Sequence, residues 1–227
     1  MAYYQQHYQH YQQPSQHYGG YGQVLQQNAF QCNAWQAMGF NNQDELQVLF
    51  NQAVQTNPQN MQRQAIQSEN LVGIMNNSAQ IRGYFRITWS RELCKVMLAM
   101  LDRSKDGFMQ WDEFMELQQC LVAWYNMFRS QDVDGNQRAD ANELLAMIRN
   151  QFRFQLTPDS ATTLLKRYSY VDEMGRCVLA FDDFVTLCVK LRALTDAFRR
   201  RDQQQHGQET GASTFGYDDF IQCTMCL

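Results

Sequence analysis

The sequence predicts an all-α fold of repeated helix-loop-helix units whose loops pair through short strands. Three observations support this class. Apolar residues recur every three or four positions over 91–101 and again over 114–128, which is typical of amphipathic helices. Only 3 prolines occur among 227 residues, so little interrupts a helical body. One pattern of helix, loop, short strand, acid and aromatic residue returns along the chain.

The first 28 residues differ from the rest. Tyr, Gln, His and Gly dominate this segment, and few aliphatic residues are available to form a core that would offset the entropy of ordering. We therefore expect a disordered tail over 1–28. The composition fits a sticky arm for partners or self-association as well as it fits a solubilising tail, and its histidines are not expected to form a specific metal site.

The helical body is expected to begin near residue 29. Asp44–Phe50 has the pattern of a helix that leaves a loop. Residues 54–80 are rich in Gln and Asn and contain Pro58, so we expect a loosely structured insertion with about one helical turn. Ser90 is a suitable N-cap for a helix over 91–101.

An acidic loop at 102–113 has the spacing of a calcium loop. Oxygen-bearing side chains stand at positions 1, 3, 5 and 12, a glycine at position 6 permits the sharp turn, and position 7 supplies a backbone carbonyl. A solvated acidic turn is the competing interpretation. The predicted ligands are Asp102, Ser104, Asp106, the carbonyl of Phe108, and Glu113.

A second acidic loop follows at 132–143. It carries four carboxylates, but Gln137 replaces the glycine of position 6 and Ala139 replaces the larger apolar residue of position 8. We expect calcium binding in the sensor range of roughly 10⁻⁷ to 10⁻⁵ M; a decayed, empty loop is the alternative. The predicted ligands are Asp132, Asp134, Asn136, the carbonyl of Arg138, and Glu143.

The two loops are separated by 18 residues, which suit one continuous helix better than two helices and a turn. The helix that leaves the first loop would then also enter the second. Its apolar stripe is expected to pack in the core, although a partner groove is an alternative. The stripe consists of Phe114, Leu117, Leu121, Trp124 and Phe128.

Three further units lack a full ligand set. A helix from Thr157–Pro158 to Tyr168 precedes a loop whose first half has no ligands at positions 3 and 5. A fifth loop over 202–214 is too long to enclose calcium. A first unit fits an eleven-residue loop over 35–45, where calcium would depend on backbone carbonyls and Glu45.

Composition argues against several functional classes. A net charge of −4 does not suggest nucleic-acid binding. The 7 cysteines at irregular spacing predict free thiols of a reducing cytosol, and Cys223–Cys226 is interpreted as packing. No segment predicts a membrane span or a signal peptide. Outside the tail only His206 could assist a cysteine nucleophile, so we do not expect an enzyme.

The repeated units and four short segments resemble the penta-EF-hand family. The likeness covers roughly 88–227 well and 29–50 loosely, and it implies a five-hand domain of about eight helices over 29–227. The segments are Met100–Arg103, Lys166–Ser169, Val189–Asp202 and Tyr217–Met225. The implied hands lie near 29–53, 91–122, 121–152, 159–192 and 189–227.

The resemblance implies a cytosolic calcium sensor that moves to membranes or membrane proteins when calcium rises. It also implies a homodimer or heterodimer through the fifth hand, about 203–226, because an odd hand leaves one strand edge unpaired. Lys190, Arg192 and 199–201 would contact anionic lipid or remain a solvated face. Alternatives are the regulatory (small) subunit of a calpain-type cysteine protease and a scaffold that assembles through the tail.

Overall fold

A computed structural model describes residues 33–225, apart from 103, 105, 133–136, 144, 146–147 and 149–156. The predicted tail over 1–28 lies outside the described residues, as do two of the predicted ligands, Asp134 and Asn136.

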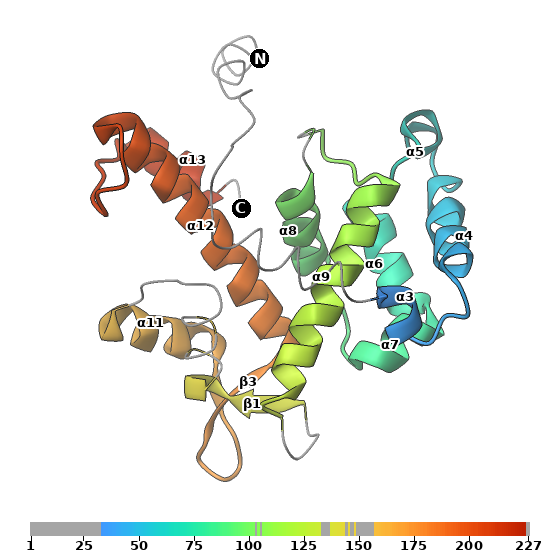
Figure 1. The fold of residues 1–227 in the computed structure, drawn as a ribbon, viewed down its shortest axis with the longest axis horizontal. Coiled ribbons are helices and arrows are strands. Elements are labelled where there is room, and N and C mark those ends of the chain that lie inside the picture. Colours follow the sequence, from blue (N-terminus) through green and yellow to red (C-terminus); the bar gives the residue numbers. More distant parts are fainter. Residues whose placement is uncertain are drawn as a thin grey trace.

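Helices make up most of the described chain, which confirms the predicted all-α class (Figure 1). The N-terminal helices are α3 (Ala34–Ala37), α4 (Gln43–Val54), α5 (Pro58–Arg63), α6 (Ser68–Asn77), α7 (Ala79–Phe85), α8 (Arg91–Leu101) and α9 (Trp111–Arg129). The C-terminal elements are β1 (Arg138–Asp140), α11 (Pro158–Tyr168), β2 (Tyr170–Val171), β3 (Cys177–Ala180), α12 (Phe181–His206) and α13 (Tyr217–Met225).

Side-chain caps begin the predicted helices where the sequence places them. The Ser90 hydroxyl accepts a hydrogen bond from the Leu93 N–H at 3.1 Å, so α8 begins at Arg91. Thr157 caps α11 in the same way, with Pro158 in its first turn. A single helix, α9, spans the interval between the two acidic loops, as predicted.

The expectation of a loosely structured insertion over 54–80 is wrong. This segment forms α5, α6 and the start of α7. Its amides act as helix caps, because the Asn57 side chain accepts from the Gln59 N–H at 2.8 Å before Pro58. Leu71 and Met75 are fully buried on one face of α6. A segment rich in Asn and Gln usually indicates a loop, but in this chain its amide side chains cap the starts of helices.

Two strand pairings join the loops of neighbouring units. Ile66 and Met109 form an antiparallel bridge, with N–H to carbonyl distances of 2.9 and 2.8 Å. In the second half of the chain, β1, β3 and β2 form a sheet in the order β1-β3-β2, in which Ala139 lies opposite Leu179. The predicted pairing of loop strands is therefore present in the described residues.

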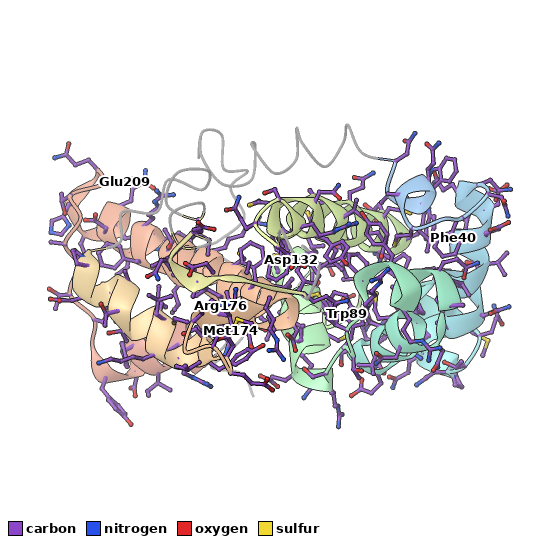
Figure 2. All side chains as sticks on the ribbon, turned by 90° about the horizontal axis from the view of Figure 1, so that it is seen from below. Phe40, Trp89, Asp132, Met174, Arg176 and Glu209 are labelled. Atoms are coloured by element: carbon purple, nitrogen blue, oxygen red, sulfur yellow. The ribbon has the colours of Figure 1, made fainter. Side chains whose placement is uncertain are left out.

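The core is continuous between the two halves of the chain. The α9 stripe is completely buried, so it is core and not a partner groove. Phe181, at the start of α12, stacks on Phe85 of α7 at 5.8 Å and meets Tyr125 of α9 edge-on at 4.9 Å. Trp89, labelled in Figure 2, also contacts Phe181 edge-on. This aromatic cluster fixes the start of α12 against α7 and α9.

Four cysteines form no disulfide in the part of the chain that the structure describes: Cys94, Cys120, Cys177 and Cys188. Burial raises the pKa of the Cys94 and Cys120 thiols to about 12, which makes them unreactive at neutral pH. The side chains of Cys223 and Cys226 are not among those described. Among the described helices, none is long and apolar enough to cross a bilayer.

Candidate functional site

The loop from Asp102 to Glu113 is organised around its first carboxylate. Asp102 accepts hydrogen bonds from the Ser104 hydroxyl at 2.9 Å and from the Gly107 N–H at 2.8 Å. Gly107 has a φ of +79°, a left-handed conformation that favours glycine. The predicted turn at position 6 is therefore present, and the chain folds back over Asp102.

The far side of this loop ends on α9. Glu113 lies in the first turn of α9, and its Oε2 accepts a hydrogen bond from the Gln110 N–H at 3.0 Å. The Glu113 residue is buried. The carboxylate of position 12 is thus drawn back toward the loop, as an EF-hand requires of its last ligand.

Asp106, at position 5, faces a partner from another unit. Its Oδ1 accepts from the Phe108 N–H at 3.0 Å, and its Oδ2 accepts from the Arg63 guanidinium at 2.6 Å. Arg63 also lies over the Phe108 ring, 4.5 Å from its centre. A predicted metal ligand is therefore bonded to a cationic side chain of α5.

The loop from Asp132 to Glu143 contains a buried oxygen without a partner. The Gln137 N–H donates to Asp132 Oδ2 at 2.9 Å, whereas Asp132 Oδ1 is buried and has no hydrogen-bond partner among the described residues. Gln137 has a φ of +63° in the place of the usual glycine. Asp140 accepts from the Glu143 N–H at 3.1 Å.

These donor sets fit a hard divalent cation. Carboxylate, hydroxyl and carbonyl oxygens are the ligands that Ca²⁺ prefers, and an unsatisfied buried carboxylate oxygen is costly without a cation. Within the described residues, no three acidic, histidine or cysteine side chains gather into a metal-binding group. In the loop of Asp102 one predicted ligand, Asp106, is bonded to Arg63.

The first unit lies elsewhere than predicted. Arg63 and Asp106 are 43 positions apart, and the same interval relates the bridged pair Ile66 and Met109. It also relates Gln64, with φ +51°, to Gly107, and the capping residue Asn70 to Glu113. The unit that pairs with the loop at 102–113 is therefore α4–α6, with its loop at 59–70.

The prediction of a first hand near 29–53 with its loop at 35–45 is corrected accordingly. Glu45 lies in the first turn of α4, where its side chain accepts from the Asn41 N–H and side-chain amide. The 59–70 loop contains only Glu69 as an acid, so composition hides it. The constant interval of 43 residues was the signal that could have revealed it.

The fourth loop is closed by its own arginine. Asp172 accepts hydrogen bonds from the Arg176 backbone N–H and from the Arg176 Nε–H, both at 2.8 Å. These contacts, the backbone N–H of Arg176 first, lower the pKa of the Asp172 carboxyl. Arg176 takes position 5 when the loop is counted from Asp172 to Asp183, so a cation stands where a ligand would be.

The fifth loop is closed by hydrogen bonds to Asp202. Its oxygens accept from the Thr210 hydroxyl at 2.6 Å, the Thr210 N–H at 2.7 Å and the Gly211 N–H at 2.8 Å, and His206 lies 2.8 Å away. These contacts, the Thr210 hydroxyl first, lower the pKa of Asp202 to about 2. The loop is held without a metal ligand set.

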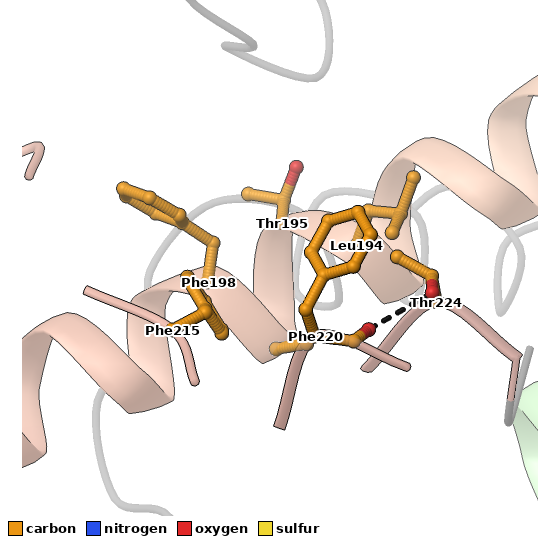
Figure 3. Close-up of a pocket in the computed structure, with 7 residues that line it drawn as sticks. Leu194, Thr195, Phe198, Phe215, Phe220 and Thr224 are labelled. Atoms are coloured by element: carbon orange, nitrogen blue, oxygen red, sulfur yellow. Dashed lines mark hydrogen bonds between the residues drawn. The ribbon is translucent and has the colours of Figure 1, made fainter. Parts of the chain in front are cut away.

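An apolar groove lies between α12 and α13, and its volume is about 340 Å³ (Figure 3). Tyr217, Phe220 and Ile221 of α13 are exposed beside it. Two arginines from the predicted basic face form ion pairs here, Arg201 with Asp219 at 2.7 Å and Arg199 with Glu209 at 3.7 Å. The groove is lined by Leu194, Thr195, Ala197, Phe198, Phe215, Phe220 and Thr224.

Comparison with known proteins gives related sequences, while no protein-family profile matches the chain. Grancalcin from Homo sapiens is 44% identical over 139 residues, which are 61% of this chain and 59% of grancalcin. Sorcin from Homo sapiens is 43% identical over 136 residues, 60% of this chain and 64% of sorcin. The chain thus spans about three fifths of the length of these relatives.

Two more distant likenesses accompany these. Calpain-A from Drosophila melanogaster is 31% identical over 137 residues, which are 60% of this chain and 16% of Calpain-A. A solved structure of a homolog of programmed cell death 6 protein from Leishmania major Friedlin aligns with a TM-score of 0.48 at 25% identity, covering 71% of this chain and 84% of that chain. Over about three fifths of its length, the chain is therefore similar in sequence to grancalcin and sorcin.

Proposed function

We propose that the chain is a cytosolic calcium sensor with its two sites in the loops at 102–113 and 132–143. The observation that carries this proposal is the shared helix. Glu113 lies in the first turn of α9, and the Asp132 N–H donates to the Phe128 carbonyl at its other end, 3.1 Å away. Any change in one loop is therefore transmitted along one rigid element to the other.

The proposed ligands are those predicted from spacing. In the first site they are Asp102, Ser104, Asp106, the carbonyl of Phe108, and Glu113. In the second site they are Asp132, Asp134, Asn136, the carbonyl of Arg138, and Glu143. Asp132 Oδ1 supports the second site, because it is buried without a hydrogen-bond partner among the described residues and a cation would satisfy it.

The conformational response follows from charge. Bound Ca²⁺ supplies positive charge that offsets the mutual repulsion of the loop carboxylates. Glu113 and Asp132 then draw the two ends of α9 toward their loops. Because α9 packs its buried stripe against the core, reorienting it changes which apolar residues face solvent. This newly exposed surface is the proposed contact for membranes or target proteins.

The test measures apolar exposure and membrane contact together. Binding of a hydrophobic dye and co-sedimentation with vesicles of phosphatidylcholine and phosphatidylserine are compared in EDTA and in 100 μM free Ca²⁺. Both signals should rise with Ca²⁺ in the wild type and stay low in a Glu113→Gln, Glu143→Gln double variant. Equal signals with and without Ca²⁺ in the wild type would contradict the sensor role.

The groove between α12 and α13 supports a dimer through the fifth hand, about 203–226. Its exposed apolar residues form the kind of surface that a partner protein buries, and the fifth loop has no strand partner within the described residues. A homodimer fits the sensor. A heterodimer with a larger protease chain would fit the alternative of a calpain-type regulatory subunit, which the similarity to Calpain-A favours. The mass of the purified complex separates these two.

A further inference from the structure

Arg63 links the first hand to the calcium loop of the second. It is the last residue of α5, and its guanidinium donates to Asp106 Oδ2 at 2.6 Å while it covers the Phe108 ring. Position 5 of that loop is thus bonded to a positive charge. The ring of Phe108, whose carbonyl is the proposed ligand at position 7, lies beneath the same group.

The fold holds Arg63 in this place. The Ile66–Met109 bridge ties the two loops together three residues after each partner of the ion pair. Gln64, with φ +51°, ends α5 immediately after Arg63 and turns the chain toward this bridge. The buried Asn60 side chain anchors α5 by donating to Asn70 at 2.8 Å. Arg63 is therefore positioned by the bridge between the two loops, by the turn at Gln64 and by the hydrogen bond of Asn60 with Asn70.

We propose that Arg63 is a tethered cation that competes with Ca²⁺ for Asp106, so that calcium binding at 102–113 releases the Arg63 side chain from the loop. This inference rests on the proposed function, because it takes Asp106 as a calcium ligand. One carboxylate oxygen cannot hold a guanidinium and coordinate a divalent cation equally well, since the two positive charges repel each other. By linkage, the Arg63 contact weakens calcium binding by the factor by which calcium weakens the contact.

The fourth loop supports this proposal, because an arginine lies at its position 5 as well. There Arg176, also at position 5, pairs with Asp172 inside its own loop. In that loop the arginine has replaced the ligand, whereas in the loop at 102–113 the arginine arrives from a neighbouring hand and the ligand remains. The second arrangement is reversible, because Asp106 keeps its carboxylate. The side chains of Arg63 and Asp106 are 48% and 31% exposed, so water is present to receive the released group.

The test replaces Arg63 by methionine, which keeps the apolar stem over Phe108 and removes the charge. Arg91→Met is the matched control, because Arg91 pairs with Glu69 of the first hand and not with the calcium loop. Calcium is titrated by Trp111 fluorescence in a Glu143→Gln background, which isolates the loop at 102–113. Arg63→Met should bind Ca²⁺ about two- to fivefold more tightly, the range for an exposed ion pair. Arg91→Met should match the parent.

Thermal melting gives a second readout. Arg63→Met should lower the melting temperature in EDTA and leave it unchanged in saturating Ca²⁺, because the ion pair exists only without calcium. An equal loss in both conditions, or an affinity no tighter than that of the parent, would overturn the proposal. If Glu113→Gln leaves calcium binding unchanged, the proposed site itself fails. If Glu113→Gln abolishes it and Arg63→Met has no effect, only the role of Arg63 fails.

Discussion

At the scale of single residues, the backbone conformation at position 6 sets the conformational cost of forming each loop. Gly107 and Gln137 both occupy the left-handed region at position 6 of their loops, and Gln64 does so in the loop of the first hand. A side chain in this region costs roughly 1–2 kcal/mol, so the loop at 102–113 forms at a lower conformational cost than the loop at 132–143. The extra carboxylate of the 132–143 loop acts in the opposite direction.

Gly107→Ala should destabilise the apo protein by about 1 kcal/mol and weaken calcium binding at 102–113, because alanine does not adopt φ +79° readily. Urea unfolding in EDTA measures the first effect. Gly83→Ala is the control of opposite sign: Gly83 is exposed within α7, and alanine there should stabilise by about 0.5–1 kcal/mol. A Gly107→Ala variant as stable as the wild type would show that the left-handed conformation at position 107 does not require glycine.

Asp202 gives a pH-dependent prediction. Its pKa in the folded chain is about 2, below the value near 3.9 of an unfolded chain, so its carboxylate stabilises the folded state. This contribution is complete above about pH 4 and is lost as the pH falls toward 2. Melting temperatures of wild type and Asp202→Asn should therefore differ at pH 6 and converge as the pH approaches 2. A constant difference across this range would contradict the assignment.

At the scale of elements, α9 and α12 connect the hands. Phe181 opens α12 and lies against Phe85 of α7 and against Tyr125 and Phe128 of α9, so it couples the fourth hand to α7 and to the helix shared by the second and third hands. Phe181 is only 1% exposed, and each of its aromatic contacts adds to the free energy gained by burying its ring. These contacts therefore stabilise the packing of the two halves of the chain against each other.

Phe181→Ala should lower the free energy of unfolding by about 3–5 kcal/mol, the usual cost of removing a buried aromatic ring. Urea denaturation followed by circular dichroism measures this loss. Val48→Ala, at a site that is 52% exposed on α4, should change stability by no more than about 0.5 kcal/mol. A loss below 1 kcal/mol for Phe181→Ala would mean that the two halves are not held together by this cluster.

Sequence patterns predicted the elements that follow local rules and missed those that depend on a partner. The caps Ser90 and Thr157 and the continuous helix between the acidic loops are local features, and each is present. The loop at 59–70 is maintained by its bridge to Met109 and by side-chain amides, so it carries no acidic signature. The contact of Arg63 with Asp106 joins residues 43 positions apart, which no local pattern reveals.

At the scale of the whole molecule, the fifth hand is the part of the chain that we propose determines assembly. The first four hands pair through Ile66–Met109 and through β1–β3, and the fifth presents the groove between α12 and α13 (Figures 1 and 3). A second copy related by a twofold axis offers the same surface in return. The proposed dimer interface and the proposed calcium sites therefore lie in separate parts of the chain.

Phe220→Asp should weaken the proposed dimer at least about tenfold, because it places a charge on an apolar surface that must lose its water. Sedimentation velocity across a range of concentrations measures this change. Met174→Asp is the matched control, since Met174 is 79% exposed on the fourth loop, away from the groove. Circular dichroism verifies that both variants remain helical. Identical sedimentation of Phe220→Asp and wild type would move the interface elsewhere.

Calcium titration by calorimetry tests the central claim most directly. Wild type should bind two Ca²⁺ per chain, and Glu113→Ala and Glu143→Ala should each lose one, because each removes the last carboxylate of one loop. The remaining site should bind more weakly than in the wild type, since both loops share α9. Unchanged stoichiometry in both variants, or no binding by the wild type at micromolar Ca²⁺, would contradict the assignment of these loops.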